Sequence, residues 1–244
     1  EGREVFYEGQ IAEKMATDLA DHGSAVTLEA FNEYVAEDSR IVRGSYRGYD
    51  LVGMDIPAAG VLSIQALQIM EKFEPSSMSE AEWFAVTGQA LSLASRELRV
   101  LGTDTAAARA TSKDWATELA RQVAVPNTPR STIGGSLLPP LQDRGDLFGG
   151  HTTHLSTADE NGMFVSLTQT LGPTMGSKVV TPGLGFLYAS TLGGYLGRME
   201  PGERARSNIC PFMVLKDGEV ILVLGAAGGG MIPPAIVHAI TRVI

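Results

Sequence analysis

The chain has 244 residues, of which 44% are hydrophobic, and it carries a formal net charge of -9. A chain of this size can bury a sizeable core, and its composition excludes a disordered protein. The acidic balance argues against nucleic acid or an anionic membrane surface as a partner, and the single cysteine, Cys210, excludes an intrachain disulfide framework and a Cys-rich metal site.

Two kinds of targeting signal have no match in the sequence. No apolar run approaches the ~20 residues that a membrane-spanning helix needs, and the first residues lack the apolar segment and cleavage site of a signal peptide. The compartment stays open, with bacterial-type cytoplasmic, periplasmic and secreted locations all compatible.

The first part of the chain favours helices, interrupted by one pair of strands. Apolar positions recur at helical spacing from Gln10 to Leu19, and a second short helix is expected after Thr27. Residues 39–54 alternate between apolar and polar side chains with many β-formers, which predicts a hairpin or paired strands.

Three further helices are predicted before residue 125. Apolar residues spaced from Val61 to Met70 predict a helix with one face on a core. Ser79 and Glu82 form a capping box that starts a long helix through Leu101. A similar signal from Thr111 to Asp114 starts the next helix.

Between Val125 and Gly150 the helical periodicity disappears, and prolines and glycines accumulate. Exposed connectors of this composition are typical sites of nicks, lids and domain boundaries. A domain boundary and an autocatalytic cleavage segment are both compatible with it.

After the connector the chain favours strands. Residues 152–157 and 163–171 are joined by an Asn-Gly turn, which gives the clearest hairpin in the sequence. A short apolar strand is expected at Leu184 to Ala189. A second hairpin is expected around Lys216-Asp217-Gly218.

The last predicted element is an apolar helix around Ile236 to Ile244, which follows a Gly-rich turn at residues 225–230. Helices followed by stacked hairpins and a strand-to-helix turn predict a layered α/β sandwich.

The stretch from Gly149 to Ser156 is the strongest candidate for chemistry. It places Thr152 at the mouth of a strand, directly after small flexible residues, where self-cleavage would expose a new nucleophile. Thr-Thr before a strand is by itself more often a sign of β-propensity alone, since β-branched residues suit a pleated surface.

Other catalytic patterns are missing. The histidines have no metal-ligand spacing, and no Gly-x-Ser-x-Gly elbow occurs. The glycines Gly228 to Gly230 open a helix, where free N–H groups form an oxyanion hole or where glycines merely permit close packing. Thr168 and Thr170 share a face of their strand, from which either reaches the first strand of the hairpin, although strand threonines are usually structural.

At this point the sequence resembles the γ-glutamyltranspeptidases, which are N-terminal nucleophile hydrolases. The Thr-Thr-His stretch is fairly specific for the family, and the matching segments occur in the family's order over nearly the whole chain. The matching segments are Phe6 to Ala12, Tyr46 to Tyr49, Thr152 to Ser156, Val165 to Leu171, Lys216 to Gly218 and Gly228-Gly229.

The resemblance implies an α+β fold, a four-layer αββα sandwich of stacked antiparallel sheets flanked by helices. Residues 1–151 would be the mostly helical C-terminal part of the large-subunit region, ending in the pre-cleavage linker, and 152–244 the N-terminal part of the small-subunit region, the two forming one folded unit. The first half of the large subunit and the end of the small subunit would lie outside Glu1 to Ile244.

The resemblance also implies a mechanism without a cofactor or metal. The precursor would cleave itself between His151 and Thr152, and the new α-amine, with a reference pKa of about 8, would act as base for the Thr152 hydroxyl. Thr170 matches the threonine that hydrogen-bonds the nucleophile, and Gly228 and Gly229 match the oxyanion-hole glycines. The side chain of Thr153 is expected to point away from the reacting face.

The substrate-binding positions depart from the family pattern. An Asn and a Gln-x-x-Asp that hold the glutamyl α-amine become Gly172, Thr191 and Gly194, and a Ser-Ser pair that touches the α-carboxylate becomes Ser207-Asn208. A buried ammonium without its counter-charge costs on the order of several kcal/mol.

The resemblance therefore implies an autoprocessing threonine amidohydrolase that cleaves a γ-glutamyl amide such as glutathione through an acyl-enzyme, with transfer to water or to an amine or amino acid acceptor. Because the α-amine anchors are altered, hydrolysis of another small amide or acyl-amino compound is the alternative. An unprocessed, inactive homologue is the alternative of another class. After processing the partners would be the two subunits of one precursor, with a homodimer as a further option.

Overall fold

A four-stranded antiparallel sheet lies at the centre of the computed structural model, which describes residues 2–100, 104–125, 152–173, 175–191 and 204–244. Its strand order is β1-β2-β5-β6. The strands are β1 (Ile41–Tyr46), β2 (Tyr49–Met54), β5 (Phe212–Lys216) and β6 (Glu219–Leu224). Since β2 pairs with β5 from Asp50↔Leu215 to Gly53↔Phe212, hairpins from distant parts of the chain share one sheet.

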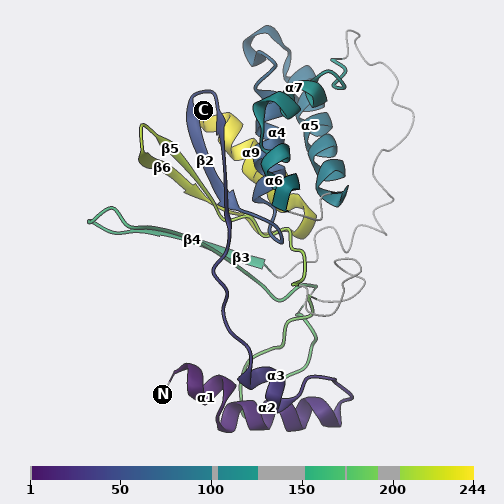
Figure 1. Ribbon diagram of the computed structural model, residues 1–244, viewed down its shortest axis with the longest axis vertical. Coiled ribbons are helices and arrows are strands. Elements are labelled where there is room, and N and C mark those ends of the chain that lie inside the picture. The colour runs from purple at the N-terminus through teal and green to yellow at the C-terminus, as the bar shows by residue number, and fades with distance from the viewer. Residues whose placement is uncertain (1, 101–103, 126–151, 174, 192–203) are drawn as a thin grey trace.

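Helices cover one face of this sheet (Figure 1). They are α4 (Gly60–Met70), α5 (Glu80–Val100), α6 (Asp104–Ala110), α7 (Lys113–Ala120) and α9 (Ile232–Val243), with the 3₁₀ turn η1 (Pro75–Ser77) between α4 and α5. The largest buried side chains under this layer include Tyr46, Ile64 and Phe212.

Helix α4 is buried on every side rather than on one. The spacing of its apolar residues predicts a single buried face, but all its residues are buried, Gln65 and Gln68 included. The reason is its position, since it packs against β1 and β2 on one side and against α5, α7 and α9 on the others. A spacing pattern that predicts one buried face cannot show that other helices pack on the remaining sides of α4.

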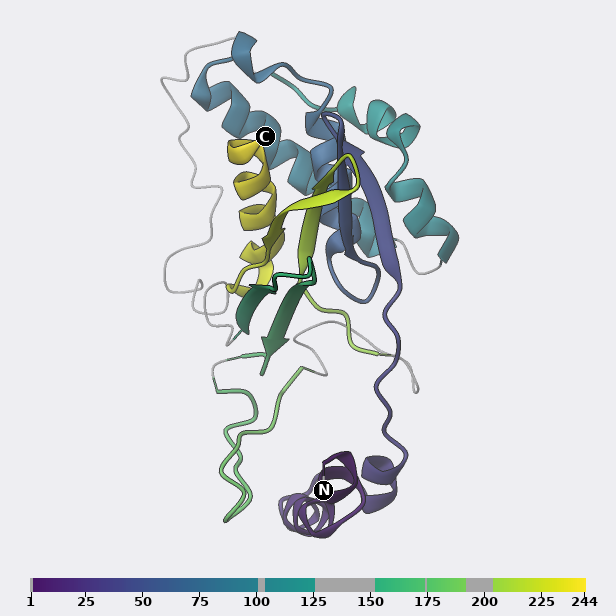
Figure 2. The ribbon, with the colours of Figure 1, turned by 90° about the vertical axis from the view of Figure 1, so that its left-hand side faces the viewer.

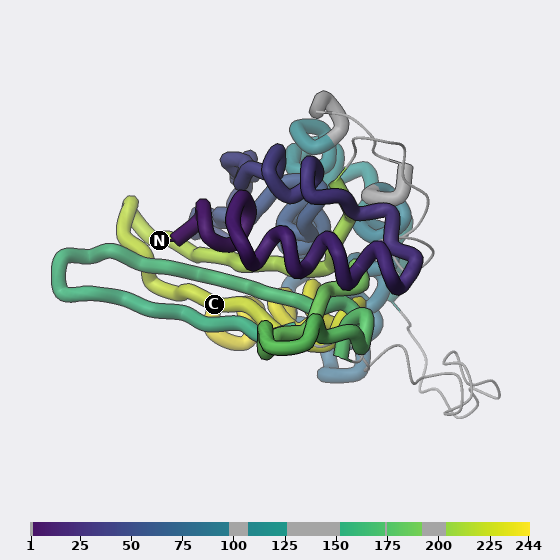
Figure 3. The backbone as a smooth tube through the Cα atoms, turned by 90° about the horizontal axis from the view of Figure 1, so that it is seen from below, coloured from purple at the N-terminus to yellow at the C-terminus, as the bar shows by residue number. Residues whose placement is uncertain are grey.

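The hairpin of β3 (Thr152–Ala158) and β4 (Phe164–Thr170) forms a second, two-stranded sheet. It lies beside the β5–β6 hairpin, as Figure 3 shows from below. The Ser166 hydroxyl joins the two sheets, because it donates to the Leu224 carbonyl at 3.1 Å and accepts from the Phe212 N–H at 3.1 Å. The predicted α+β class, with antiparallel sheets and flanking helices, is confirmed.

No described helix covers the outer face of the β3–β4 sheet, where the expected αββα sandwich would have its fourth layer. Leu155, Val165 and Leu167 on that face are 44%, 40% and 39% exposed. The described residues therefore supply the first helical layer and both sheets.

Three short helices lie apart from the central sheet, near the N-terminus: α1 (Arg3–Tyr7), α2 (Gln10–Asp21) and α3 (Leu28–Asn32). Figure 2 shows them beside the loop that follows β4. The Thr181 hydroxyl donates to the Asp18 carboxylate at 2.7 Å, and the rings of Phe6 and Phe186 lie 5.6 Å apart. These contacts join α1 and α2 to the loop.

Local capping signals predicted the helix starts well. The Ser79 N–H and hydroxyl each donate to the Glu82 carboxylate at 2.7 Å, which confirms the capping box of α5, and Thr27 caps α3. The cap of α7 is Ser112, one residue after the predicted Thr111, and accepts from the Trp115 N–H. Helix α6 was not predicted, because its alanine-rich sequence lacks the large apolar residues that create periodicity.

The strand predicted at Leu184 to Ala189 is wrong, since this segment forms no sheet. Gly183 and Gly185 have φ angles of 82° and 74°, so the backbone around Leu184 turns instead of extending. The final helix starts at Ile232, earlier than predicted, with prolines in its first turn. The predicted hairpins at residues 39–54, 152–171 and around Lys216 are confirmed.

The start of α4 gives a stability prediction. A Cβ on Gly60 would lie 2.4 Å from the Met54 carbonyl oxygen and 2.8 Å from the Met54 nitrogen, so Gly60→Ala must push α4 off β2. We expect a destabilisation of roughly 1–3 kcal/mol or more, as for other overpacked cores, measured by denaturant unfolding of the full-length protein.

The matched control is Gly88→Ala in α5, where a Cβ would meet nothing within 4 Å. Removing an exposed glycine from a helix should stabilise by about 0.5–1 kcal/mol. Equal effects of the two substitutions would contradict the close packing of α4 on β2.

Candidate active site

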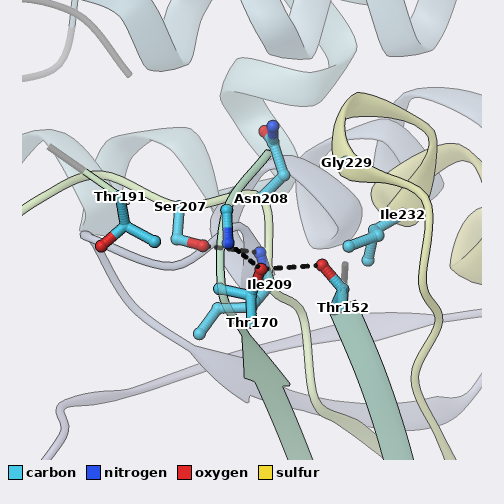
Figure 4. Close-up of a pocket in the computed structure, with 9 residues that line it drawn as sticks. Thr152, Thr170, Thr191, Ser207, Asn208, Ile209, Gly229 and Ile232 are labelled. Atoms are coloured by element: carbon cyan, nitrogen blue, oxygen red, sulfur yellow. Dashed lines mark hydrogen bonds between the residues drawn. The ribbon is translucent and has the colours of Figure 1, made fainter. Parts of the chain in front are cut away.

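A small pocket opens where β3 begins and β4 ends (Figure 4). The strand register places Thr152 directly opposite Thr170, and the Thr152 hydroxyl donates to the Thr170 hydroxyl oxygen at 3.0 Å. The pocket is small and partly open to solvent. Its lining consists of Thr152, Thr170, Gly172, Thr191, Ser207, Asn208, Ile209, Gly229 and Ile232.

The local backbone holds the Thr170 hydroxyl, which in turn binds the Thr152 hydroxyl. The Thr170 hydroxyl oxygen also accepts from the Gly172 N–H at 3.0 Å, which fixes its position as the chain leaves β4. Thr153 pairs with Gln169, and both side chains lie exposed on the outer face of the hairpin. The predicted alternation therefore holds, with Thr152 toward the pocket and Thr153 away from it.

A glycine turn forms the wall that carries Gly229. Gly228 has a φ of 129° and Gly229 a φ of 56°, and the turn passes through η4 (Gly229–Met231) into α9. Within the described part of the chain, the N–H groups of Gly228 and Gly229 have no hydrogen-bond acceptor. Free N–H groups at the start of a helix favour an anion, because the helix dipole adds its positive end there.

The opposite wall is the segment from Ser207 to Ile209. The Ser207 N–H donates to the Pro57 carbonyl at 2.8 Å, and the Ile209 carbonyl accepts from the Ala59 N–H at 3.0 Å. The segment is thereby fixed to the loop between β2 and α4. In Figure 4 the Asn208 amide points away from the two threonine hydroxyls.

The third wall has no room for a side chain at Gly172. A Cβ there would lie 2.4 Å from the Ser190 carbonyl oxygen, and the φ of +87° disfavours any other residue. The same Cβ would lie 3.3 Å from the Thr191 methyl group, so Thr191 presents carbon to this part of the pocket. The Ser190 N–H donates to the Leu171 carbonyl at 2.8 Å, which holds the two segments together.

None of the described lining residues has an ionisable side chain. The nearest thiol, Cys210, is fully buried, and burial raises its pKa to about 12. It is therefore a structural residue rather than a nucleophile. A neutral pocket of hydroxyls, methyls and backbone suits a reaction whose nucleophile is a hydroxyl.

Two searches of the described residues give negative results. No group of three or more His, Cys, Asp or Glu side chains lies close enough to hold a metal ion, and no described helix is long and apolar enough to cross a membrane.

The structure brings most of the predicted site residues together. Seven of them line the pocket: Thr152, Thr170, Gly172, Thr191, Ser207, Asn208 and Gly229. Gly228 directly precedes Gly229 in the glycine turn. His151 and Gly194 lie outside the described residues. Ile209 and Ile232 were not predicted, because single apolar residues carry no local signal of a binding role.

The family comparison covers the whole chain. A model of the family described as gamma-glutamyltranspeptidase matches residues 1–244. Among the relatives that match over the full chain are two with different names. They are an acylase ACY 1 proenzyme of Pseudomonas sp. (strain V22), 30% identical over 261 residues, and a glutathione hydrolase proenzyme of Escherichia coli (strain K12), 28% identical over 273 residues. The chain spans 45% of the length of each.

A solved structure shares the fold. The cephalosporin acylase from Bacillus halodurans has a TM-score of 0.79 at 22% sequence identity, over 98% of this chain and 44% of that one. The arrangement of sheets and helices in this chain is therefore also that of this acylase structure.

Proposed function

The chain belongs to the gamma-glutamyltranspeptidase family, and from that premise we propose that it carries the nucleophile and the cleavage site of an amidohydrolase that activates itself. Thr152 is the nucleophile, and Thr170 orients it. Gly228 and Gly229 supply the oxyanion hole. The observation that carries this proposal is the 3.0 Å hydrogen bond between the Thr152 and Thr170 hydroxyls, in a pocket that Gly229 also lines.

The first reaction is self-cleavage. The Thr152 hydroxyl oxygen attacks the carbonyl carbon of His151, the peptide C–N bond breaks, and the Thr152 nitrogen takes up the proton that the hydroxyl loses and becomes a free amine. The resulting ester between His151 and the Thr152 oxygen is hydrolysed by water. The products are a His151 carboxylate and a chain that begins at Thr152, the large-subunit and small-subunit parts of one precursor. The names of the two relatives, both called proenzymes, support such a step.

The second reaction uses the new N-terminus. The Thr152 amine, with a reference pKa of about 8, takes the hydroxyl proton as the oxygen attacks a substrate amide. The negative oxygen of the tetrahedral intermediate accepts from the N–H groups of Gly228 and Gly229. The amine then returns the proton to the leaving nitrogen, and an ester remains on Thr152. Water resolves it to an acid, or an amine to a new amide.

The acyl group has two candidates. A γ-glutamyl group, as in glutathione, agrees with the family name and with the name of the E. coli relative. A small acyl group without an α-ammonium is the alternative, and it agrees with the name acylase of the Pseudomonas relative.

The pocket wall favours the second candidate. An ammonium needs a carboxylate or several acceptors when it leaves water, and the described lining offers no carboxylate. Gly172 has no space for a side chain that would supply an acceptor, and Thr191 presents its methyl group nearby.

The test compares two anilides that differ only in the ammonium, γ-glutamyl-p-nitroanilide and glutaryl-p-nitroanilide. We expect the full-length protein to cleave the glutaryl compound with the higher kcat/KM, because its acyl group brings no ammonium that would need a counter-charge in the pocket. A ratio of ten or more in favour of the γ-glutamyl compound would reject the second candidate. Cleavage of neither, with an uncleaved wild-type chain, would favour the inactive homologue.

A further inference from the structure

The inner face of the β3–β4 hairpin carries a ladder of polar side chains below the candidate nucleophile. The register places His154 opposite Thr168 and Ser156 opposite Ser166, on the same face as Thr152 and Thr170. His154 Nδ1 lies 2.8 Å from the Thr168 hydroxyl, and its Nε2 lies 3.0 Å from the Ser156 hydroxyl. Both ring nitrogens are therefore engaged, and the imidazole is held in one orientation.

The imidazole rests directly on Gly225, the residue that follows β6. A Cβ on Gly225 would lie 2.1 Å from Nδ1, 2.3 Å from Cε1 and 2.5 Å from Cγ of His154. Only a glycine fits under the ring. Gly225 also starts the turn that leads through Gly228 to Gly229.

One side chain thus connects the two parts of the candidate site. His154 lies two residues after Thr152 on the same strand face, and its ring contacts the base of the turn that carries the glycine N–H groups. The ladder adds a second tie, since the Ser166 hydroxyl donates to the Leu224 carbonyl next to Gly225. The spacing between nucleophile and turn therefore depends on how closely the ring and Gly225 approach.

We propose that His154 is a positioning residue for the amide chemistry, setting the distance between Thr152 and the Gly228–Gly229 turn through its contact with Gly225. This rests on the function proposed for Thr152, and it adds a role for two residues outside the pocket lining. His154 takes no part in proton transfer to substrate.

The charge state of the ring agrees with a positioning role. Burial lowers the pKa of His154, which favours the neutral ring. A neutral ring donates from one nitrogen and accepts at the other, matching two hydroxyl neighbours that do both. The ring of His154 packs against β4 and β6. The groups of these elements that face the ring are hydroxyls, backbone atoms and the neighbouring Gly225, rather than charged side chains.

The test is a double-mutant cycle in the full-length protein, with His154→Ala, Gly225→Ala and the double variant. Gly225→Ala should lower kcat by about 100-fold with little change in KM, as expected when reacting groups shift by about 1 Å. In the His154→Ala background the added methyl fills vacated space, so Gly225→Ala should cost less than about 5-fold. Rates of self-cleavage should follow the same order.

His154→Asn is the conservative variant, because its amide retains a polar atom near the Nδ1 position that faces Thr168. The kcat of His154→Asn should be at least about tenfold higher than the kcat of His154→Ala. Thr157→Ala, on the exposed outer face of the same strand, is the matched control and should keep wild-type kcat. Thermal melting of each variant separates lost positioning from lost folding.

Each outcome decides the proposal. The proposal is overturned if Gly225→Ala lowers kcat by the same factor in the wild-type and His154→Ala backgrounds. It is also overturned if the variants change KM alone, or if their loss of kcat only follows the fall in melting temperature. Where Gly225→Ala fails to fold, the comparison of His154→Asn with His154→Ala decides, and equal kcat values would overturn it. A wild type that cleaves neither itself nor amides rejects the proposed function instead, whereas active His154 variants with normal kcat reject only the positioning role.

Discussion

Replacing Thr152 with alanine is expected to leave the full-length protein as one uncleaved chain and to reduce amide hydrolysis to background. In the proposed mechanism the hydroxyl is the attacking group in both reactions, and the pocket offers no described ionisable group that could replace it. Loss of a nucleophile costs on the order of 10⁴-fold or more in kcat. Intact mass and anilide hydrolysis measure the two effects.

Two variants at the same place make this prediction specific. Thr153→Ala removes an identical hydroxyl from the exposed outer face of the strand, and it should cleave and turn over normally. Thr152→Ser keeps a hydroxyl and should retain both activities at reduced rates. If Thr153→Ala were as damaging as Thr152→Ala, the assignment of the reacting face would be wrong.

Gly228→Ala is expected to lower kcat by about 10²–10³-fold, the usual cost of losing an oxyanion-hole donor. An added Cβ causes no steric clash, since its nearest atom would be the Met231 Cβ at 3.7 Å. The obstacle is the φ of +129°, which L side chains rarely adopt, so the backbone must rotate and carry its N–H groups away. The measurement is kcat for the preferred anilide, with KM recorded separately.

Gly230→Ala is the matched control two residues later. Gly230 has no positive φ, and an added Cβ would meet nothing within 4 Å. Its kcat should stay within about threefold of wild type, as for an unconstrained surface substitution. A normal kcat for Gly228→Ala would remove the glycine turn from the mechanism.

Local signals in the sequence predicted local structure. The capping box at Ser79, the Asn-Gly turn after β3 and the alternation around Thr152 each depend on neighbouring residues, and the structure confirms them. The prediction failed where the hydrophobic pattern was weak, or where glycines prevented the structure that the pattern favours. The alanines of α6 gave no periodicity, and the glycines beside Leu184 prevent the strand that its apolar neighbours favour.

Long-range packing explains the rest of what the sequence did not show. The complete burial of α4, the lack of space at Gly172 and the contact of His154 with Gly225 all depend on segments far apart in the chain. For His154 a usable signal existed, since it lies two residues after Thr152 and therefore on the same strand face. Nothing near Gly225 in the sequence indicates which ring lies over it.

The most direct measurement of the central claim is mass mapping of the acylated protein. Full-length protein is mixed with its preferred anilide, quenched in acid within one turnover and digested. We expect a small-subunit peptide that begins at Thr152 and carries the acyl group as an ester on the Thr152 oxygen. An acyl group on any other residue, or turnover by a protein whose chain is still continuous through His151 and Thr152, would contradict it.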